Sequence, residues 1–276
     1  MSKKRRSSLK AELFVTILFF AGLAVFAYPF VARAVNTLTL SARVTRDRKK
    51  AEANVKRQQA KIKRENEALA KQGLRPNADV FTQKGQGVQQ IKALREHLIG
   101  AVTIPSLAVN LPLYDTTNEV LMESGAVVLP GTSFPTGGAS THTVVTAHSG
   151  IPSKTLFDDL HELKKGQLFI FTIDGEHLAY KVNRIKVIEP DDVSSLQIEP
   201  GKDLATLMTC TPIGQNSHRL LVTGYRVPYT EQAAKASTRS TTRAKALSWA
   251  VIAAAVLGLA LLGYLIYRLV RKHRHH

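Results

Sequence analysis

The stretch ATLMTCTPIGQNSHRLLVTGYRV, residues 205–227, decides the fold of this 276-residue chain. Two runs of apolar and β-branched residues, 205–209 and 220–227, flank a loop that contains a proline and a glycine. This pattern is typical of two antiparallel strands joined by a short loop. Cys210 ends the first run and Arg219 precedes the second. A hairpin here would bring a thiol close to a guanidinium group.

Similar short runs extend upstream from this hairpin, separated by turn signals such as Pro-Gly and Asp-Gly pairs. They lie at residues 101–104, 111–113, 127–129, 143–147, 168–173 and 179–188. About eight strands at this spacing predict an all-β barrel or sandwich. Short helices are expected at residues 88–98, 118–124 and 155–163.

His148 follows the run 143–147 and is itself followed by Gly150, so an imidazole stands at another strand end. Taken singly, an isolated cysteine is usually a small buried hydrophobe, and a lone histidine or arginine is usually a surface group. Together, Cys210, His148 and Arg219 supply a nucleophile, a proton carrier and a cation. His142 and His218 are rival candidates for the base.

These segments resemble a known family. TLMTC at 206–210, HRLLVTG at 218–224 and TAHSG at 146–150 closely resemble the sortases, the cysteine transpeptidases of Gram-positive cell surfaces. GTSFPTGG at 131–138, LFDDLHEL at 156–163 and IEPGKDLATLMTCTP at 198–212 are similar to the class C, or pilus, sortases. The resemblance covers about residues 100–229 and implies a closed eight-stranded β-barrel.

The resemblance also implies roles and partners. Cys210 matches the nucleophile, His148 the general acid/base, and Arg219 the cation that holds substrate and stabilises the oxyanion. The substrate would be an LPxTG-type sorting signal, cut between Thr and Gly through a thioacyl intermediate. The acceptor would be a lysine amine of the next pilin subunit. No cofactor and no metal are implied.

Three alternatives remain at this stage. Within the same chemistry, the chain could attach single surface proteins to peptidoglycan. A hydrolytic cysteine protease is a second enzyme class, although the papain-like order of Cys before His is reversed here. A non-catalytic surface scaffold is a third reading, and it leaves the combination of His148, Cys210 and Arg219 unexplained.

Pilus sortases resemble one another in a loop that covers the active site through an Asp-Pro-aromatic motif. The nearest match here is Asp79-Val80-Phe81, which lacks the proline and its fixed φ. As a hypothesis, Asp79 and Phe81 form a substrate-gating lid. Phe81→Ala should then speed maleimide labelling of Cys210, and an unchanged rate would count against the lid.

Two uncharged apolar runs, residues 13–31 and 246–267, are long enough to cross a membrane as helices. Two spans place both termini on one side. Basic residues flank both ends of the first run, so charge alone does not fix the orientation. A surface substrate favours cytoplasmic termini, with the catalytic domain on the extracellular side of a Gram-positive membrane.

The expected organisation follows from these runs. It comprises a cytoplasmic basic segment (1–12), a transmembrane helix (13–31), a basic helical stalk (32–76), a lid loop with a helix (77–99), the catalytic barrel (100–229), a linker (230–245), a second transmembrane helix (246–267) and a cytoplasmic basic tail (268–276). The stalk, rich in Lys, Arg, Glu and Gln, is expected to be a solvated charged helix with a thin apolar stripe.

The formal net charge of +17 lies outside the expected catalytic region. Residues 77–228 hold 12 Lys and Arg against 15 Asp and Glu. A nucleic-acid partner is therefore not expected, whereas membrane lipid is a natural partner for the basic flanks. A single cysteine excludes an intramolecular disulfide. Asp158, Asp159 and Glu162 are expected to form a solvated face, and the C-terminal histidines a tail without a designed metal site.

Overall fold

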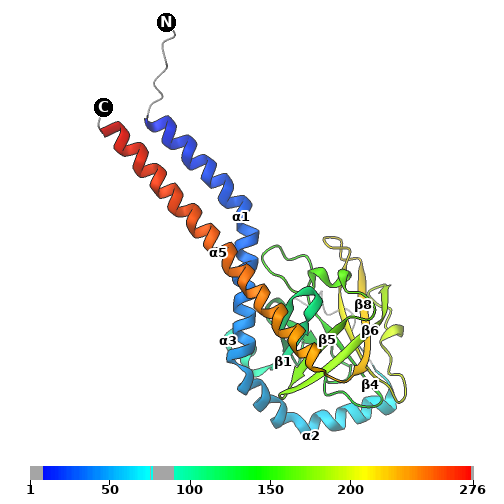
Figure 1. Cartoon of the computed structure of the whole chain (residues 1–276). Helices are drawn as coiled ribbons and strands as arrows, with labels where there is room; N and C mark the ends of the chain where they lie inside the picture. The colour runs from blue at the N-terminus through cyan, green and yellow to red at the C-terminus, as the bar shows by residue number, and fades with distance from the viewer. Residues whose placement is uncertain (1–8, 75, 77–89, 275–276) are drawn as a thin grey trace.

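The computed structural model describes residues 9–74, 76 and 90–274 (Figure 1). Long helices lie at both ends of the chain, and the strands lie between them. The helices are α1 (Leu9–Arg46), α2 (Arg48–Gln72), α3 (Gln90–Glu96), α4 (Glu119–Ser124) and α5 (Glu231–Arg274), with short 3₁₀ turns η2 (Pro105–Leu107), η3 (Asp158–Glu162) and η4 (Ser194–Leu196). The strands are β1 (Leu98–Ile104), β2 (Val109–Tyr114), β3 (Ala126–Val128), β4 (Thr141–Thr146), β5 (Leu168–Ile173), β6 (Glu176–Ile188), β7 (Asp203–Thr211) and β8 (His218–Val227).

The eight strands close into a barrel in the order β1-β2-β3-β4-β7-β8-β6-β5. The expected eight-stranded barrel is thus confirmed, and the sandwich is not adopted. Most neighbours are antiparallel, but β2 with β3 and β4 with β7 are parallel. The parallel β4–β7 pair joins segments about sixty residues apart, and it brings the chain after β4 beside the end of β7.

The barrel is closed by the β1–β5 pair, and its interior is filled by apolar side chains. Gly100 lies where these strands approach each other, because a Cβ there would stand 2.0 Å from the backbone oxygen of Thr172. Within the barrel, the rings of Phe169 and Tyr180 stack with centroids 5.5 Å apart. The buried Tyr180 hydroxyl donates a hydrogen bond to Asp203 Oδ1 at 3.0 Å, so its polar end is satisfied.

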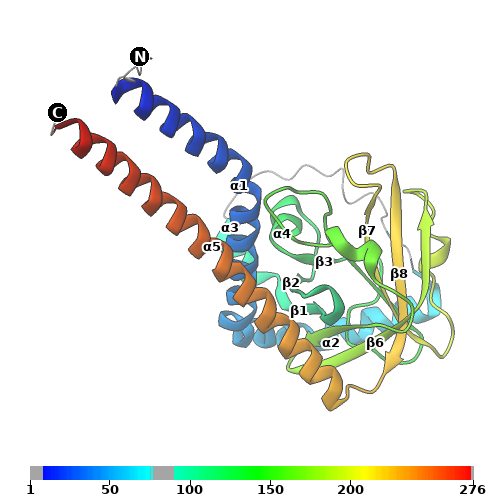
Figure 2. The same cartoon turned by 45° about the horizontal axis from the view of Figure 1, so that its top comes forward.

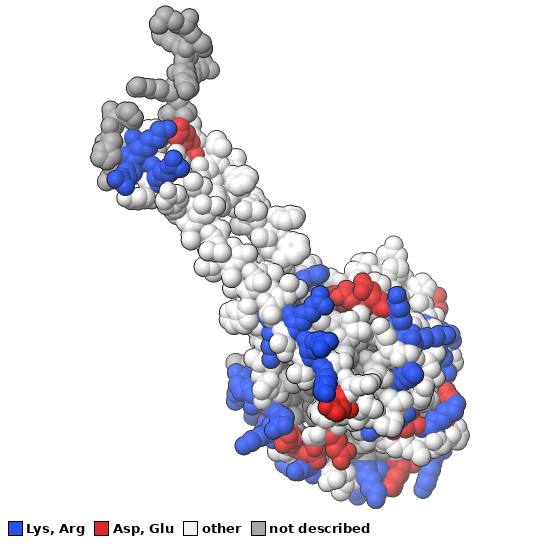
Figure 3. Space-filling view, viewed as in Figure 1, with Lys and Arg blue, Asp and Glu red and all other residues white. Residues whose placement is uncertain are grey.

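Helices α1 and α5 lie side by side and project together from the barrel (Figures 1 and 2). Both are long and apolar enough to cross a membrane. The projecting part is uncharged over most of its length in Figure 3, with basic side chains at its far end and where it meets the barrel. In Figure 2, β7 and β8 lie on the side of the barrel away from the two long helices.

Helix α2 differs from the expected solvated helix. Ala51, Val55 and Ile62 on one face of α2 are buried, and α2 packs on β1. The Asn54 amide donates hydrogen bonds to the backbone oxygens of Arg95 (2.9 Å) and Leu98 (2.8 Å). The thin apolar stripe is therefore a packing surface, and the charged residues cover the outside of the barrel.

Residues 230–245, expected to link the barrel to the second apolar run, are helical from Glu231 onward, and α5 continues from there into that run without interruption. Ala233 is buried. The other residues of this segment are exposed or partly buried, so only Ala233 is enclosed here.

Candidate active site

Cys210 and Arg219 are paired across the antiparallel β7–β8 ladder. Directly opposed residues in such a ladder point to the same face, with Cβ atoms about 5 Å apart. Both side chains are buried, at 6% and 4% exposure. The β7–β8 pairing therefore places a sulfur beside a guanidinium at one end of the barrel.

Two side-chain hydrogen bonds position the chain around His148. Thr209 Oγ1 donates to the backbone oxygen of Ala147 at 2.7 Å, and Ser149 Oγ donates to that of Cys210 at 2.8 Å. These bonds bracket His148 on both sides. They extend the parallel β4–β7 pairing, whose last pair is Thr146 with Met208, toward the end of β7. The half-buried imidazole thus belongs to the same rim as Cys210.

The loop between β7 and β8 holds the guanidinium. Arg219 Nη1 donates to the backbone oxygens of Asn216 (3.0 Å) and His218 (3.1 Å). Asn216 adopts a left-handed conformation with φ 56°, and its own N–H donates to Pro212 O at 2.9 Å. Asparagine tolerates this region better than most residues. The turn therefore presents a carbonyl to Arg219 and holds its guanidinium at the start of β8.

Burial lowers the pKa of His148, an effect that Lys154 reinforces and that Glu123 and Glu119 oppose. The neutral imidazole is therefore favoured at neutral pH. A neutral ring is the form that accepts a proton from a thiol, so His148 is suited to act first as a base. After it has accepted that proton, it becomes an acid for a leaving amine.

Asp158 departs from the expected solvated face. Its side chain is buried at 8% exposure, and Oδ1 accepts a hydrogen bond from Gly150 N–H. Among the described residues, Oδ2 has no hydrogen-bond partner. Burial raises the pKa of Asp158, while the Gly150 bond and Arg33 act in the opposite direction. Asp158 thus anchors the loop that carries His148, a role that no sequence signal separates from exposed Asp159.

The loop after His148 is held at two further points. Phe157 N–H donates to the His148 carbonyl at 3.0 Å. Arg33 Nε, just beyond the first apolar run, donates to Pro152 O at 3.0 Å. The loop after His148 is therefore in direct contact with the helix that contains the first candidate span.

The two rival histidines lie elsewhere. His142 is fully buried, with Nδ1 2.8 Å from Gln197 O and Nε2 2.7 Å from Thr206 Oγ1, so both ring nitrogens are engaged. His218 is next to Arg219, and alternate residues of a strand face opposite sides. Its ring lies 3.2 Å from Glu189 Oε1. Neither imidazole is placed to act on Cys210. The expected lid residues Asp79 and Phe81 lie outside the described residues.

Comparisons with known proteins agree with the barrel and its rim. A family model described as Sortase domain matches residues 102–227. Sortase A of Bacillus anthracis is 28% identical over 131 residues, which cover 47% of this chain and 60% of that protein. Sortase A of Streptococcus agalactiae serotype III is 29% identical over 125 residues, covering 44% of this chain and 50% of that protein. The matches thus span only 60% and 50% of the length of these two curated relatives.

Solved structures match over a longer part of the chain. Sortase C of Streptococcus pneumoniae is 37% identical with a TM-score of 0.56, covering 68% of this chain and 97% of that structure. Sortase C1 of Pilus Island 1 from group B Streptococcus is 34% identical with a TM-score of 0.59, covering 70% and 94%. The structural likeness therefore extends beyond the barrel into the flanking helices.

Proposed function

This chain belongs to the sortase family, and we propose that it is a membrane-anchored cysteine transpeptidase that joins pilin subunits. One observation carries the chemical part of this proposal. Cys210 is paired with Arg219 across β7–β8, and hydrogen bonds from Thr209 and Ser149 hold the chain on both sides of His148 at the same rim. A nucleophile, a proton carrier and a fixed cation therefore come from the neighbouring ends of three strands, β4, β7 and β8.

The first half-reaction forms an acyl-enzyme. His148 accepts the proton of the Cys210 thiol, and the thiolate attacks the threonine carbonyl carbon of an LPxTG-type signal. The carbonyl oxygen becomes an oxyanion, which Arg219 stabilises as a nearby cation. The C–N bond to glycine then breaks, protonated His148 gives its proton to the leaving amine, and a thioester with Cys210 remains.

The second half-reaction transfers the acyl group. A lysine amine attacks the thioester carbonyl, and neutral His148 accepts the proton that this amine loses. Arg219 stabilises the second oxyanion as it did the first. The C–S bond breaks, an isopeptide bond forms, and Cys210 leaves as a thiolate that recovers its proton from His148.

The acceptor is proposed from the structural neighbours. Solved relatives with 34–43% identity include sortases described as pilus-related or from pilus islands. The two candidate spans support membrane anchoring, and we propose cytoplasmic termini with the barrel on the extracellular side. Attachment of single proteins to peptidoglycan is the second candidate, since two sortase A proteins match 47% and 44% of this chain.

The proposal is tested with the full-length chain in lipid nanodiscs, an LPxTG-type peptide and separate amine acceptors. We expect mass spectrometry to find a thioester on Cys210 and a ligated product with a pilin-derived lysine peptide. Cys210→Ala should abolish both. Product with a peptidoglycan-type amine alone would favour the second candidate, and hydrolysis without any amine-dependent product would contradict transpeptidation.

A further inference from the structure

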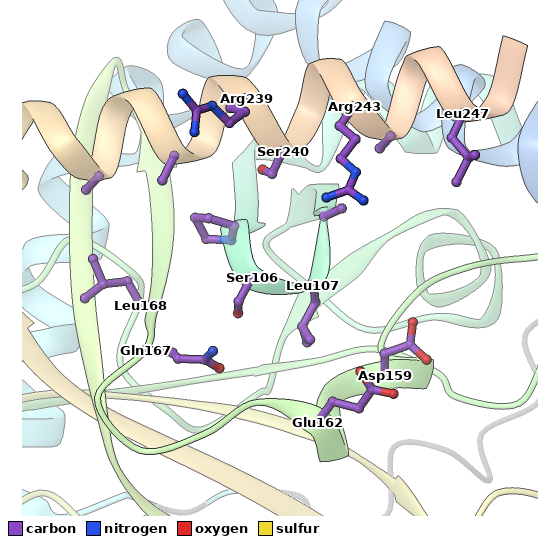
Figure 4. A pocket seen from close by; sticks show the side chains of 15 residues that line it. Ser106, Leu107, Asp159, Glu162, Gln167, Leu168, Arg239, Ser240, Arg243 and Leu247 are labelled. Carbon is purple, nitrogen blue, oxygen red and sulfur yellow. The ribbon is translucent and has the colours of Figure 1, made fainter. Parts of the chain in front are cut away.

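A groove lies between the first turns of α5 and the barrel (Figure 4), and none of the described residues that line it belongs to β7 or β8. Its volume is about 680 Å³. The barrel side consists of the η2 turn, η3 and the start of β5, and small residues of α5 form the roof. Leu107, Leu168 and Leu247 give the groove apolar walls, and none of its lining residues is aromatic.

Opposite charges face each other across this groove. Arg243 extends from α5 into the space, while Asp159 and Glu162 stand on the opposite wall (Figure 4). Arg239 lies one turn earlier on α5 and also borders the groove, but its side chain points away from the space (Figure 4). Within the described part of the chain, these four side chains make no hydrogen bond or ion pair with one another or with other residues. The groove therefore offers separate sites for an anion and a cation.

The groove is continuous with the proposed membrane span. Leu247 lines it and is the second residue of the apolar run 246–267. Arg243 precedes Leu247 by about one helical turn, so its guanidinium lies at the level where a span passes into lipid headgroups. A ligand that enters from the bilayer surface would meet the apolar wall first and the charges next.

We propose that this groove binds the headgroup of a zwitterionic aminophospholipid, an inference that rests on the proposed membrane anchoring. The phosphate lies against Arg243, the primary ammonium between Asp159 and Glu162, and the acyl chains run along Leu247. A purely anionic headgroup leaves the two carboxylates without a cation. A choline headgroup has no N–H to donate, and the aromatic side chains that favour quaternary ammonium groups are absent from the lining.

The test uses the full-length protein in detergent, mixed with equal amounts of phosphatidylethanolamine, phosphatidylcholine and phosphatidylglycerol, with native mass spectrometry as the readout. The wild type should retain phosphatidylethanolamine preferentially. Arg243→Gln should lower this retention about fivefold, the effect of one cation near a lipid surface. Asp159→Asn combined with Glu162→Gln should remove the preference over phosphatidylglycerol, and Ser240→Trp should reduce retention by obstructing the groove without changing its charge.

Matched controls separate the groove from general charge effects. Lys235→Gln lies on the same helix but outside the groove, and exposed Glu176→Gln lies on β6, so both should retain lipid as the wild type does. Cys210→Ala should also retain it, since the readout does not depend on catalysis. Equal retention of the three lipids, or equal effects of Arg243→Gln and Lys235→Gln, would overturn the inference and leave the transpeptidase proposal intact.

Discussion

Cys210 and Arg219 are cross-strand partners, the penultimate residue of β7 opposite the second residue of β8. The nine-residue separation of the two residues in the sequence is spanned by a turn whose Asn216 carbonyl accepts a hydrogen bond from Arg219 itself. The cation is thus attached to the same hairpin as the thiol. Its distance from the sulfur is set by strand register and not by the movement of a separate loop.

Arg219→Lys should lower kcat/KM for peptide cleavage by about 10²- to 10³-fold, because lysine keeps the charge but loses the planar fork that Asn216 and His218 hold. Peptide cleavage kinetics and thermal melting measure the effect. Arg226→Lys, on the same strand, is the control and should stay near wild type. Equal losses from the two variants would argue against a specific role for Arg219.

His148→Ala should reduce transpeptidation by about 10²- to 10⁴-fold through loss of the proton carrier. His218→Ala removes an exposed imidazole on the opposite face of β8 and should retain nearly full activity. Initial rates with peptide and amine distinguish the two variants. If His218→Ala were the more damaging change, the assignment of the base would be wrong.

Stability should fall as the pH drops from about 7 toward 5. Burial lowers the pKa of His142 below its usual value of about 6.5. Between the two pKa values the imidazole is therefore protonated in the unfolded chain and neutral in the folded protein, which favours unfolding. This stabilisation is fully present above the unfolded pKa and is lost at lower pH. The lowered pKa of His148 also makes the folded protein less stable as the pH falls.

Chemical denaturation at several pH values measures this slope. His142→Gln should flatten this slope. An unaltered slope in His142→Gln would show that buried His142 does not govern the acid response.

Asp158→Ala should destabilise the protein by about 1–3 kcal/mol, since it leaves the Gly150 N–H without its acceptor. It should also lower kcat by loosening the loop that carries His148. Asp158→Asn keeps an oxygen that can accept this bond and should recover much of the activity. Asp159→Ala, at the exposed neighbouring carboxylate, should stay within about 0.5 kcal/mol. Comparable effects at the two positions would contradict an anchoring role for Asp158.

Several features were predictable from the sequence because they depend on local patterns. Short apolar and β-branched runs between turn residues predicted the strands. The predicted barrel is confirmed. The TLMTC and HRLLVTG segments identified the family through its resemblance. Cys210, His148 and Arg219 could be singled out because each stands at the end of a strand-like run.

Other features were not predictable because they depend on packing between distant segments. The sequence predicted that helix α2 is a solvated charged helix. Its thin apolar stripe does not indicate which distant segment it packs against. The helical conformation of residues 231–245 was not evident, because these Ser, Thr, Ala and basic residues show no core-forming pattern. Asp158 and Asp159 are adjacent acidic residues in the sequence, and only the fold of the loop buries one and exposes the other.

The sequence by itself determined the alternation of strands and turns, the two apolar runs and the chemical groups available, because these are properties of residue type and spacing. The tertiary structure decided which groups meet. The parallel β4–β7 pairing brings His148 to the end of β7 and leaves His142 inside the barrel wall, and the β7–β8 register sets Arg219 opposite Cys210. Register is fixed by the burial of whole strand faces, since a slip of one residue would turn every side chain of a strand to the other side.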